Sequence, residues 1–419
     1  MSKNIFIFDP DWWQEISITI TKNKSRSILT AFGVFWGMFM LVVMVGAGGA
    51  LENGIMGETE GMATNSCFFW ANRTSVPYKG FRKDRQWNLK MEDYLAVKQQ
   101  VKNIEYVSPR VSKWDVNVVR GDKTGTYAVA GYLPEYNNIM AVRIIQGRYI
   151  NEIDVLEKRK VCVIGKRIYE EMFGKGKNVI GQLIQVNGIY FQIIGVGERI
   201  SESYIGSNPD ETVIAPLPTV QQIFNMGNVI YNIAVTAKPD VEVAVVQQAV
   251  TDIITKRNNI SPDDTSAVGC FNLSEMFKVW QALFIGVAAL VWIVGLGTLI
   301  AGGIGISNIM LVTVRERTKE IGIRRALGAT PRNIIIQIMS ESIVLTAMAG
   351  IAGLMFGVGV LQLVSTALSQ SDGFFKNPQI SFGVSIGALV ILLVIGTVAG
   401  YMPARRAMRI KPIEAIREE

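Results

Sequence analysis

Four long apolar runs set the limits on what this chain can fold into. Each is long enough to cross the hydrocarbon core of a bilayer, which takes about 20 predominantly apolar residues in a helix. Because a chain of 419 residues that is 49% hydrophobic gathers its apolar residues in these runs, the sequence predicts a membrane protein with a four-span α-helical transmembrane bundle. The second run exceeds the bilayer thickness, so it either tilts strongly or continues outward as a stalk. The predicted spans are residues 28–51, 277–310, 334–368 and 380–402.

The segment between the first two spans, residues 52–276, has a different character. It contains no span-length apolar run, and strand and turn signals take over. Alternating segments flank Gly121-Asp122 and Asn187-Gly188, which are dipeptides that favour tight hairpin turns. The segment therefore predicts a large α+β extracytoplasmic domain between spans 1 and 2, with a hydrophobic core of its own.

Cations beside the spans predict how the chain is oriented. Lysine and arginine gather just before the first span, between the second and third spans, and after the fourth. Cytoplasmic loops carry such an excess, so both termini are expected in the cytoplasm. The net charge of +7 is explained by this topology and by contact with membrane lipid, and we expect no nucleic-acid partner. The expected cytoplasmic segments are residues 1–27, 311–333 and 403–419; the expected periplasmic ones are 52–276 and 369–379.

The loop between the second and third spans carries the clearest candidate site. Its six cations exclude it from the bilayer, because each would cost about 2.5–3.5 kcal/mol at a helix centre. Glu320 and Arg324 stand in the order that stabilises a helix, and Gly328 before Thr330-Pro331 is typical of a helix end followed by a helix start. We expect a short helix that contacts a cytosolic partner, with residues 315–320 making a charged approach and 321–329 the packed contact. The expected coupling residues are Arg315, Arg317, Glu320, Ile321, Gly322, Arg324, Arg325, Leu327 and Gly328.

Residues inside the spans supply further candidates. Glu341 is the one ionisable residue well inside the third span, and intramembrane carboxylates are functional candidates by default. Its alternative role, reaching water near the cytoplasmic edge, stays open. Small residues spaced four apart let helices approach closely. The predicted packing pairs are Gly33 with Gly37, Ala301 with Gly305, Gly353 with Gly357, and Gly396 with Gly400.

Several classes of site lack the residues they need. The chain contains no histidine, the commonest general base and metal ligand, and no G-x-x-x-x-G-K-[ST] phosphate loop. Asp263 and Asp264 are typical of a solvated turn. The three cysteines show no paired spacing, and a bridge between Cys67 and Cys270 stays open as an alternative. We predict no catalytic residue, no bound cofactor and no metal site.

Four parts of the sequence carry a recognisable pattern. The loop contains N-I-M-L-V-T-V-R-E-R-T-K-E-I-G-I-R-R-A-L-G-A-T-P-R-N-I (308–334), and the end contains P-A-R-R-A-M-R-I-K-P-I-E-A-I-R-E (403–418). The opening contains N-K-S-R-S-I-L-T-A-F-G (23–33), and the outer segment contains Q-G-R, V-C-V-I-G, F-G-K-G-K-N-V-I-G-Q and F-Q-I-I-G-V. Together they resemble the MacB/FtsX-like permease family of ABC transporters, which usually also has an acid at the position of Glu341.

The resemblance implies properties that composition does not show. A dimer of two permeases, identical or paralogous, would bind ABC ATPase subunits through the loop helix. ATP would be bound by those subunits, and their closure would pass along the helices to the outer domain, a mode called mechanotransmission. The outer domain would divide into a porter-like part and an inserted part at about residues 145–209. MacB itself carries a fused ATPase; no such domain is evident in this sequence, so the ATPase is expected as a separate chain and the permease as non-catalytic.

The expected function is that of the permease subunit of an ABC-type exporter in a bacterial inner membrane. A periplasmic adaptor and an outer-membrane channel are expected as further partners. Two alternatives stay open: release of lipoproteins from the inner membrane, and control of an external enzyme without transport.

Overall fold

The computed structural model describes residues 24–368 and 378–408. Most of the predicted N-terminal segment 1–27, of the predicted loop 369–379 and of the predicted tail 403–419 lies outside these ranges. The chain forms two compact units, one of residues 1–55 with 282–419 and one of residues 56–281.

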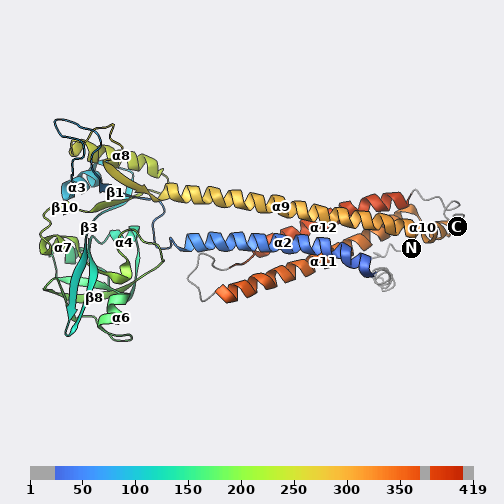
Figure 1. The fold of residues 1–419 in the computed structure, drawn as a ribbon, viewed down its shortest axis with the longest axis horizontal. Coiled ribbons are helices and arrows are strands. Elements are labelled where there is room, and N and C mark those ends of the chain that lie inside the picture. Colours follow the sequence, from blue (N-terminus) through green and yellow to red (C-terminus); the bar gives the residue numbers. More distant parts are fainter. Residues whose placement is uncertain (1–23, 369–377, 409–419) are drawn as a thin grey trace. The chain divides into compact units, whose positions relative to one another are not determined.

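Four long helices form the first unit, which we call the membrane unit. Each is long and apolar enough to cross a bilayer, and this confirms the predicted four-span class. The longest has 44 residues, about 66 Å at 1.5 Å per residue, which is twice the hydrocarbon thickness. These helices are α2 (Lys24–Gly57), α9 (Leu273–Glu316), α11 (Pro331–Leu368) and α12 (Phe382–Ala407), and the short α10 (Thr318–Ala326) connects α9 to α11 (Figure 1).

Glycines bring the helices of the membrane unit close together. A Cβ added at Gly33 would meet the Cα of Gly302 at 3.8 Å, which places α2 against α9. A Cβ at Gly353 would lie 2.5 Å from the carbonyl oxygen of Phe35, which places α11 against α2. Small residues at such contacts allow backbones to approach where larger side chains would hold them apart.

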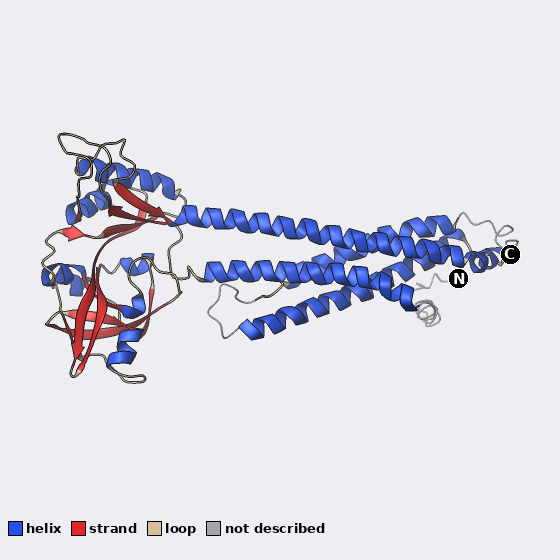
Figure 2. Ribbon diagram, viewed as in Figure 1, coloured by secondary structure: helices blue, strands red, loops and turns tan. Residues whose placement is uncertain are grey.

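A mixed sheet organises the second unit, the outer domain, as the predicted α+β class requires (Figure 2). Its strand order is β12-β1-β11-β3-β4-β9-β6-β8-β5, with β7 pairing to β3 and β8, and β2 with β10 forms a separate ribbon. The strands are β1 (Ser66–Ala71), β2 (Leu89–Lys90), β3 (Ile104–Arg120), β4 (Lys123–Tyr132), β5 (Val142–Gly147), β6 (Val161–Gly165), β7 (Leu183–Val186), β8 (Ile189–Arg199), β9 (Thr212–Pro216), β10 (Val229–Ile230), β11 (Asn232–Ala237) and β12 (Val268–Asn272).

The two predicted hairpins are confirmed. Arg120 pairs with Lys123 across the turn that joins β3 to β4. Val186 pairs with Ile189 across the turn that joins β7 to β8. The turn residues Asn187 and Gly188 both have positive φ, +49° and +80°, as a tight type I′ turn requires.

Helices cover the sheet and close its core. Amphipathic α8 buries Val246, Val250 and Ile254, the face that its 3.6-residue period predicts. β3 is long enough to pair with β11 near its start and with β7 near its end. The outer-domain helices are α3 (Met91–Gln100), α4 (Tyr136–Ile139), α5 (Glu152–Leu156), α6 (Lys166–Met172), η2 (Pro209–Glu211), α7 (Leu217–Ile223) and α8 (Val243–Arg257).

The predicted solvated turn at Asp263 and Asp264 is wrong for the second residue. Asp264 is 5% exposed and accepts hydrogen bonds from the backbone of Ser75 at 2.6 Å and of Val76 at 3.0 Å. It therefore anchors a loop that lies far away in sequence. Cys67 and Cys270 are free thiols on the paired strands β1 and β12, so the structure contains no bridge between them.

Candidate functional site

The candidate site is α10, the short helix between the second and third spans. The chain leaves α9 at Arg317, whose φ and ψ of −96° and 13° lie outside the helical region. The hydroxyl of Thr318 then bonds to the carbonyl of Arg315 at 2.7 Å and to that of Val314 at 3.2 Å. These bonds satisfy carbonyls that the end of α9 would leave without a partner. The chain bends at this point and α10 begins.

The end of α10 has the geometry of a Schellman motif. Gly328 has a φ of +103°, which a glycine adopts without strain, and its N–H donates to the carbonyl of Arg325 at 3.1 Å. The N–H of Ala329 donates to the carbonyl of Arg324 at 3.0 Å. Helix α11 starts at Pro331, so the predicted helix end and helix start are both confirmed.

The inner face of α10 packs against the membrane helices. Ile321 is 8% exposed and Gly322 is also buried. Ile321 shares an apolar cluster with side chains from the end of α9, the start of α11 and the end of α12. The predicted coupling residues Ile321 and Gly322 therefore hold α10 in place. The other buried members of the cluster are Val314, Ile334, Ile338, Ala404 and Ala407.

The outer face of α10 is apolar and open. Leu327 is 84% exposed and Ile323 is 46% exposed. The two are four residues apart, so they lie on the same side of the helix. Arg315, Glu320 and Gly328 are exposed as well. Because α10 packs through its other face, this side is left exposed.

An ion pair joins the start of α10 to the interior of α11. Arg317 Nη1 lies 3.3 Å from Glu341 Oε1. The side chain of Glu341 is 6% exposed and that of Arg317 is 26% exposed, so the pair is largely withdrawn from solvent. Glu341, which the sequence singled out alone, is thus brought together with a predicted coupling residue. A cavity of about 30 Å³ lies beside the pair, and both members of the pair line it.

Two more arginines connect α10 to its neighbours. Arg324 bonds to Glu320 at 2.9 Å and to Gln337 of α11 at 3.0 Å. Arg325 donates to the carbonyl of Met408 at the end of α12, at 3.0 Å. The sequence motifs did not predict a role for Gln337 or Met408. Gln337 had a signal, since it stands four residues before Glu341 on the same helix face. The Met408 contact involves a backbone oxygen and leaves no trace in the sequence.

Three of the four predicted packing pairs lie at contacts between spans. The pair Ala301 with Gly305 does not, because Ala301 is exposed and a Cβ added at Gly305 would meet nothing within 4 Å. Gly33 and Gly37 of α2 face α9, and Gly353 and Gly357 of α11 face α2. Gly396 and Gly400 of α12 face Thr346 and Ser342 of α11. Among the residues described, no group of three or more cysteine, aspartate or glutamate residues could hold a metal ion.

Four spans, an outer α+β domain between the first two and a short helix between the second and third define a permease-type membrane protein. The model of the MacB-like periplasmic core domain matches residues 27–253, and that of the FtsX-like permease C-terminal region matches residues 292–412. The chain therefore belongs to the MacB/FtsX-like family of export-type ABC transporter permeases, as its motifs indicated. The family and the four apolar helices make it a multi-pass inner-membrane protein.

Named relatives align along nearly the whole chain. The macrolide export ATP-binding/permease protein MacB of Bdellovibrio bacteriovorus is 29% identical over 403 residues, which are 96% of this chain and 60% of the relative. The pyoverdine export ATP-binding/permease protein PvdT of Pseudomonas entomophila is 26% identical over 95% of this chain and 58% of its own length. The chain thus spans about 60% of these relatives. A crystal structure of the periplasmic region of MacB from Actinobacillus actinomycetemcomitans superposes with a TM-score of 0.43 at 21% identity, covering 54% of this chain and 97% of that one.

Proposed function

We propose that the chain is the permease of an ABC-type exporter and that α10 is the element that a separate ATPase subunit moves. The outer face of α10 supports this proposal most directly, because Leu327 and Ile323 leave an apolar contact open beside exposed charges. Both named relatives are ATP-binding/permease proteins for export. Residues 1–419 contain no phosphate-binding loop motif, so in this proposal ATP binds outside these residues.

Among the described residues, three polar contacts would pass movement of α10 to the spans. The Arg317–Glu341 pair and the Arg324–Gln337 bond lead into α11, and the Arg325–Met408 bond leads to α12. Such contacts let a displaced helix carry its neighbours, because packed interfaces shift between discrete arrangements rather than deforming continuously. We propose that the spans then pass the motion to the outer domain. Helix α9 offers a continuous route, since it follows β12 directly in the chain.

In this proposal, α10 and both termini face the cytoplasm. The cations of the loop, together with those before α2 and after α12, support this orientation under the positive-inside rule. The outer domain then faces the periplasm.

Purification of the tagged full-length chain from its native membranes tests the proposal. We expect an ATPase with a phosphate-binding loop to co-purify and to hydrolyse ATP. Leu327→Asp should remove the ATPase from the preparation, because it places a charge in the apolar contact. Leu156→Asp, at a 79% exposed leucine of the outer-domain helix α5, is the matched control for an added charge elsewhere. An ATPase that stays bound to Leu327→Asp as it does to the wild type would refute the assignment of α10.

A further inference from the structure

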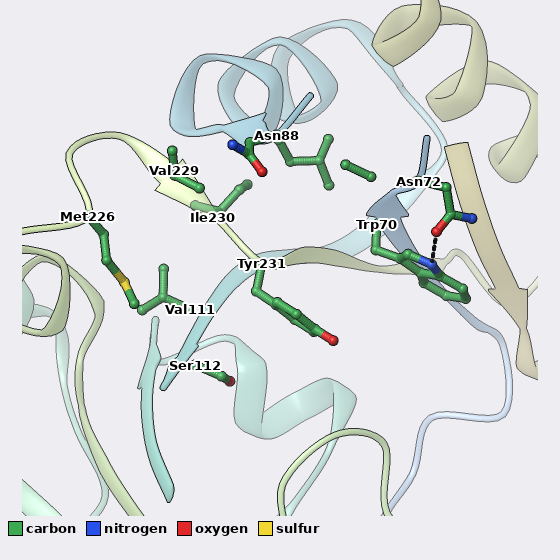
Figure 3. Close-up of a pocket in the computed structure, with 11 residues that line it drawn as sticks. Trp70, Asn72, Asn88, Val111, Ser112, Met226, Val229, Ile230 and Tyr231 are labelled. Carbon is green, nitrogen blue, oxygen red and sulfur yellow. Dashed lines mark hydrogen bonds between the residues drawn. The ribbon is translucent and has the colours of Figure 1, made fainter. Parts of the chain in front are cut away.

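The outer domain contains a pocket that ATPase coupling does not use. Its volume is about 650 Å³, within the range of roughly 300–1,000 Å³ typical of small-molecule sites. It lies where β1 ends, beside β3 and the β2–β10 ribbon (Figure 3). The buried side chains of Leu89, Val111 and Ile230 line it. None of the described side chains that line it carries a charge.

Aromatic rings stand around this pocket. Tyr231 is 50% exposed, and its ring lies 5.2 Å from that of Trp114 at an interplanar angle of 72°. This edge-to-face contact fixes the Tyr231 ring beside the opening. The indole of Trp70 is held by its hydrogen bond to Asn72 Oδ1 at 3.0 Å, drawn as a dashed line in Figure 3. Two oriented rings beside an apolar floor favour a ligand with a flat or ring-shaped apolar part.

The buried guanidinium of Arg110 lies next to Ser112, a polar residue that lines the pocket. Arg110 is fully buried, and within the described part of the chain it forms no salt bridge with a carboxylate. It donates to the carbonyl of Ile205 at 3.0 Å and to the hydroxyl of Ser207 at 3.2 Å. The rings of Tyr132 and Tyr231 flank it, each with its centroid 5.9 Å from the guanidinium carbon. Hydrogen bonds and rings stabilise this charge but do not neutralise it.

Ser112 connects the cation to the pocket. Its hydroxyl oxygen accepts a hydrogen bond from Arg110 Nε at 2.9 Å, and its side chain lines the pocket. The oxygen is therefore occupied as an acceptor, and its own proton donates to no other described group. A hydroxyl that accepts from a cation becomes a stronger donor, because hydrogen bonds in a chain polarise one another. Ser112 thus presents a polarised donor to whatever enters.

We infer that this pocket binds an amphipathic organic acid, with its ring against Tyr231 and Trp70 and its carboxylate at the Ser112 hydroxyl. The unneutralised charge of Arg110 selects the anion over a neutral molecule of the same shape. All the residues that would contact the acid lie in the outer domain. The inference therefore holds whether the acid is transported or acts as a signal.

Saturation-transfer NMR on the full-length chain in lipid nanodiscs tests this inference. The probes are indole-3-acetate and its neutral analogue indole-3-acetamide, with empty nanodiscs as the blank. We expect saturable binding of the acid above the blank and at least about fivefold weaker binding of the amide. Tyr231→Ala should weaken binding of both probes. Ser112→Ala should lower the affinity for the acid by about tenfold and remove the preference for the acid over the amide.

Matched variants separate a binding defect from a folding defect. Ser108→Ala changes another buried serine of β3 that does not line the pocket, and it should leave both affinities unchanged. Thermal unfolding of each variant shows whether it retains its fold. The inference is overturned if the acid shows no saturable binding above empty nanodiscs, if the amide binds equally well, or if folded Tyr231→Ala and Ser112→Ala bind as the wild type does.

Discussion

Arg317, between α9 and α10, and Glu341, inside α11, form an ion pair with 3.3 Å between Nη1 and Oε1. The pair is withdrawn from solvent and ties a short helix to a long span. Exposed pairs contribute about 0.2–1 kcal/mol, whereas a carboxylate left buried by loss of its cation costs about 3–5 kcal/mol. Because the pair joins the start of α10 to α11, it should restrict movement of α10 relative to α11.

A double-mutant cycle on this pair should reveal strong coupling. We expect Arg317→Ala to lower the free energy of unfolding by about 3 kcal/mol, and Glu341→Gln to lower it by about 1–2 kcal/mol because the amide still accepts a hydrogen bond. The control pair is Lys278 with Glu242, also 3.3 Å apart but with side chains 64% and 72% exposed. Denaturant unfolding in detergent measures both cycles. Equal coupling energies for the two pairs would contradict the account.

The two faces of α10 should respond differently to truncation. Ile321→Ala removes a buried side chain and should destabilise the membrane unit by about 2–4 kcal/mol. Leu327→Ala changes a side chain that is 84% exposed and should alter stability by less than about 0.5 kcal/mol. Thermal unfolding of the purified permease measures both effects, and co-purification of the ATPase shows whether Leu327→Ala weakens the partner contact instead. If Leu327→Ala destabilises the permease in the absence of the ATPase, the Leu327 side chain already packs against the permease itself.

Glycine contacts in α11 make a position-specific prediction. A Cβ at Gly353 would lie 2.5 Å from the Phe35 carbonyl oxygen, whereas a Cβ at Gly359 would meet nothing within 4 Å. Gly353→Val should therefore force α11 away from α2 and cost about 1–3 kcal/mol. Gly359→Val, on the same helix, is the control. Similar melting temperatures for the two variants would show that α2 and α11 do not meet at Gly353.

The lowered pKa of Asp264 leads us to expect that the outer domain loses stability in acid. Burial raises the pKa of this carboxyl, but hydrogen bonds from Val76 and Ser75 outweigh burial and bring the pKa to about 2. A pKa below the unfolded value of about 3.9 contributes stability, about 2 kcal/mol, that is complete above pH 5 and is lost as the pH falls towards 2. The stability gap between wild type and Asp264→Asn should therefore shrink as the pH falls from 5 to 2. Exposed Asp263→Asn should show no such gap; a pH-independent gap for Asp264→Asn would exclude the mechanism.

Much of this architecture is visible in the sequence because it has local causes. Apolar runs specify the four spans, Asn187-Gly188 specifies a hairpin, and Gly328 before Pro331 specifies a helix end and start. Local patterns also identified Glu341 as unusual. Local patterns failed where a contact joins residues that are far apart in the sequence. Asp264 is buried and accepts a hydrogen bond from Ser75, which lies 189 residues away in the sequence. The strand order of the outer domain, with β11 between β1 and β3, is likewise a product of long-range pairing.

The candidate site was predictable as a location but not as a geometry. The sequence marked residues 315–328, yet it could not separate the buried face at Ile321 from the open face at Leu327. That separation depends on where α10 packs, which the ends of α9, α11 and α12 decide. The pocket beside Tyr231 left no motif, because its walls come from four separate strands and their flanking residues.

Photo-crosslinking at the open face of α10 tests the central claim most directly. Benzoylphenylalanine replaces Leu327 in one variant and Leu363, another exposed leucine, in a second, and both are illuminated in cells. We predict that position 327 crosslinks to an ABC ATPase subunit, identified by mass spectrometry, and that position 363 does not. An ATPase adduct missing at position 327, or equally abundant at position 363, would contradict the claim that α10 is the contact through which ATP drives this permease.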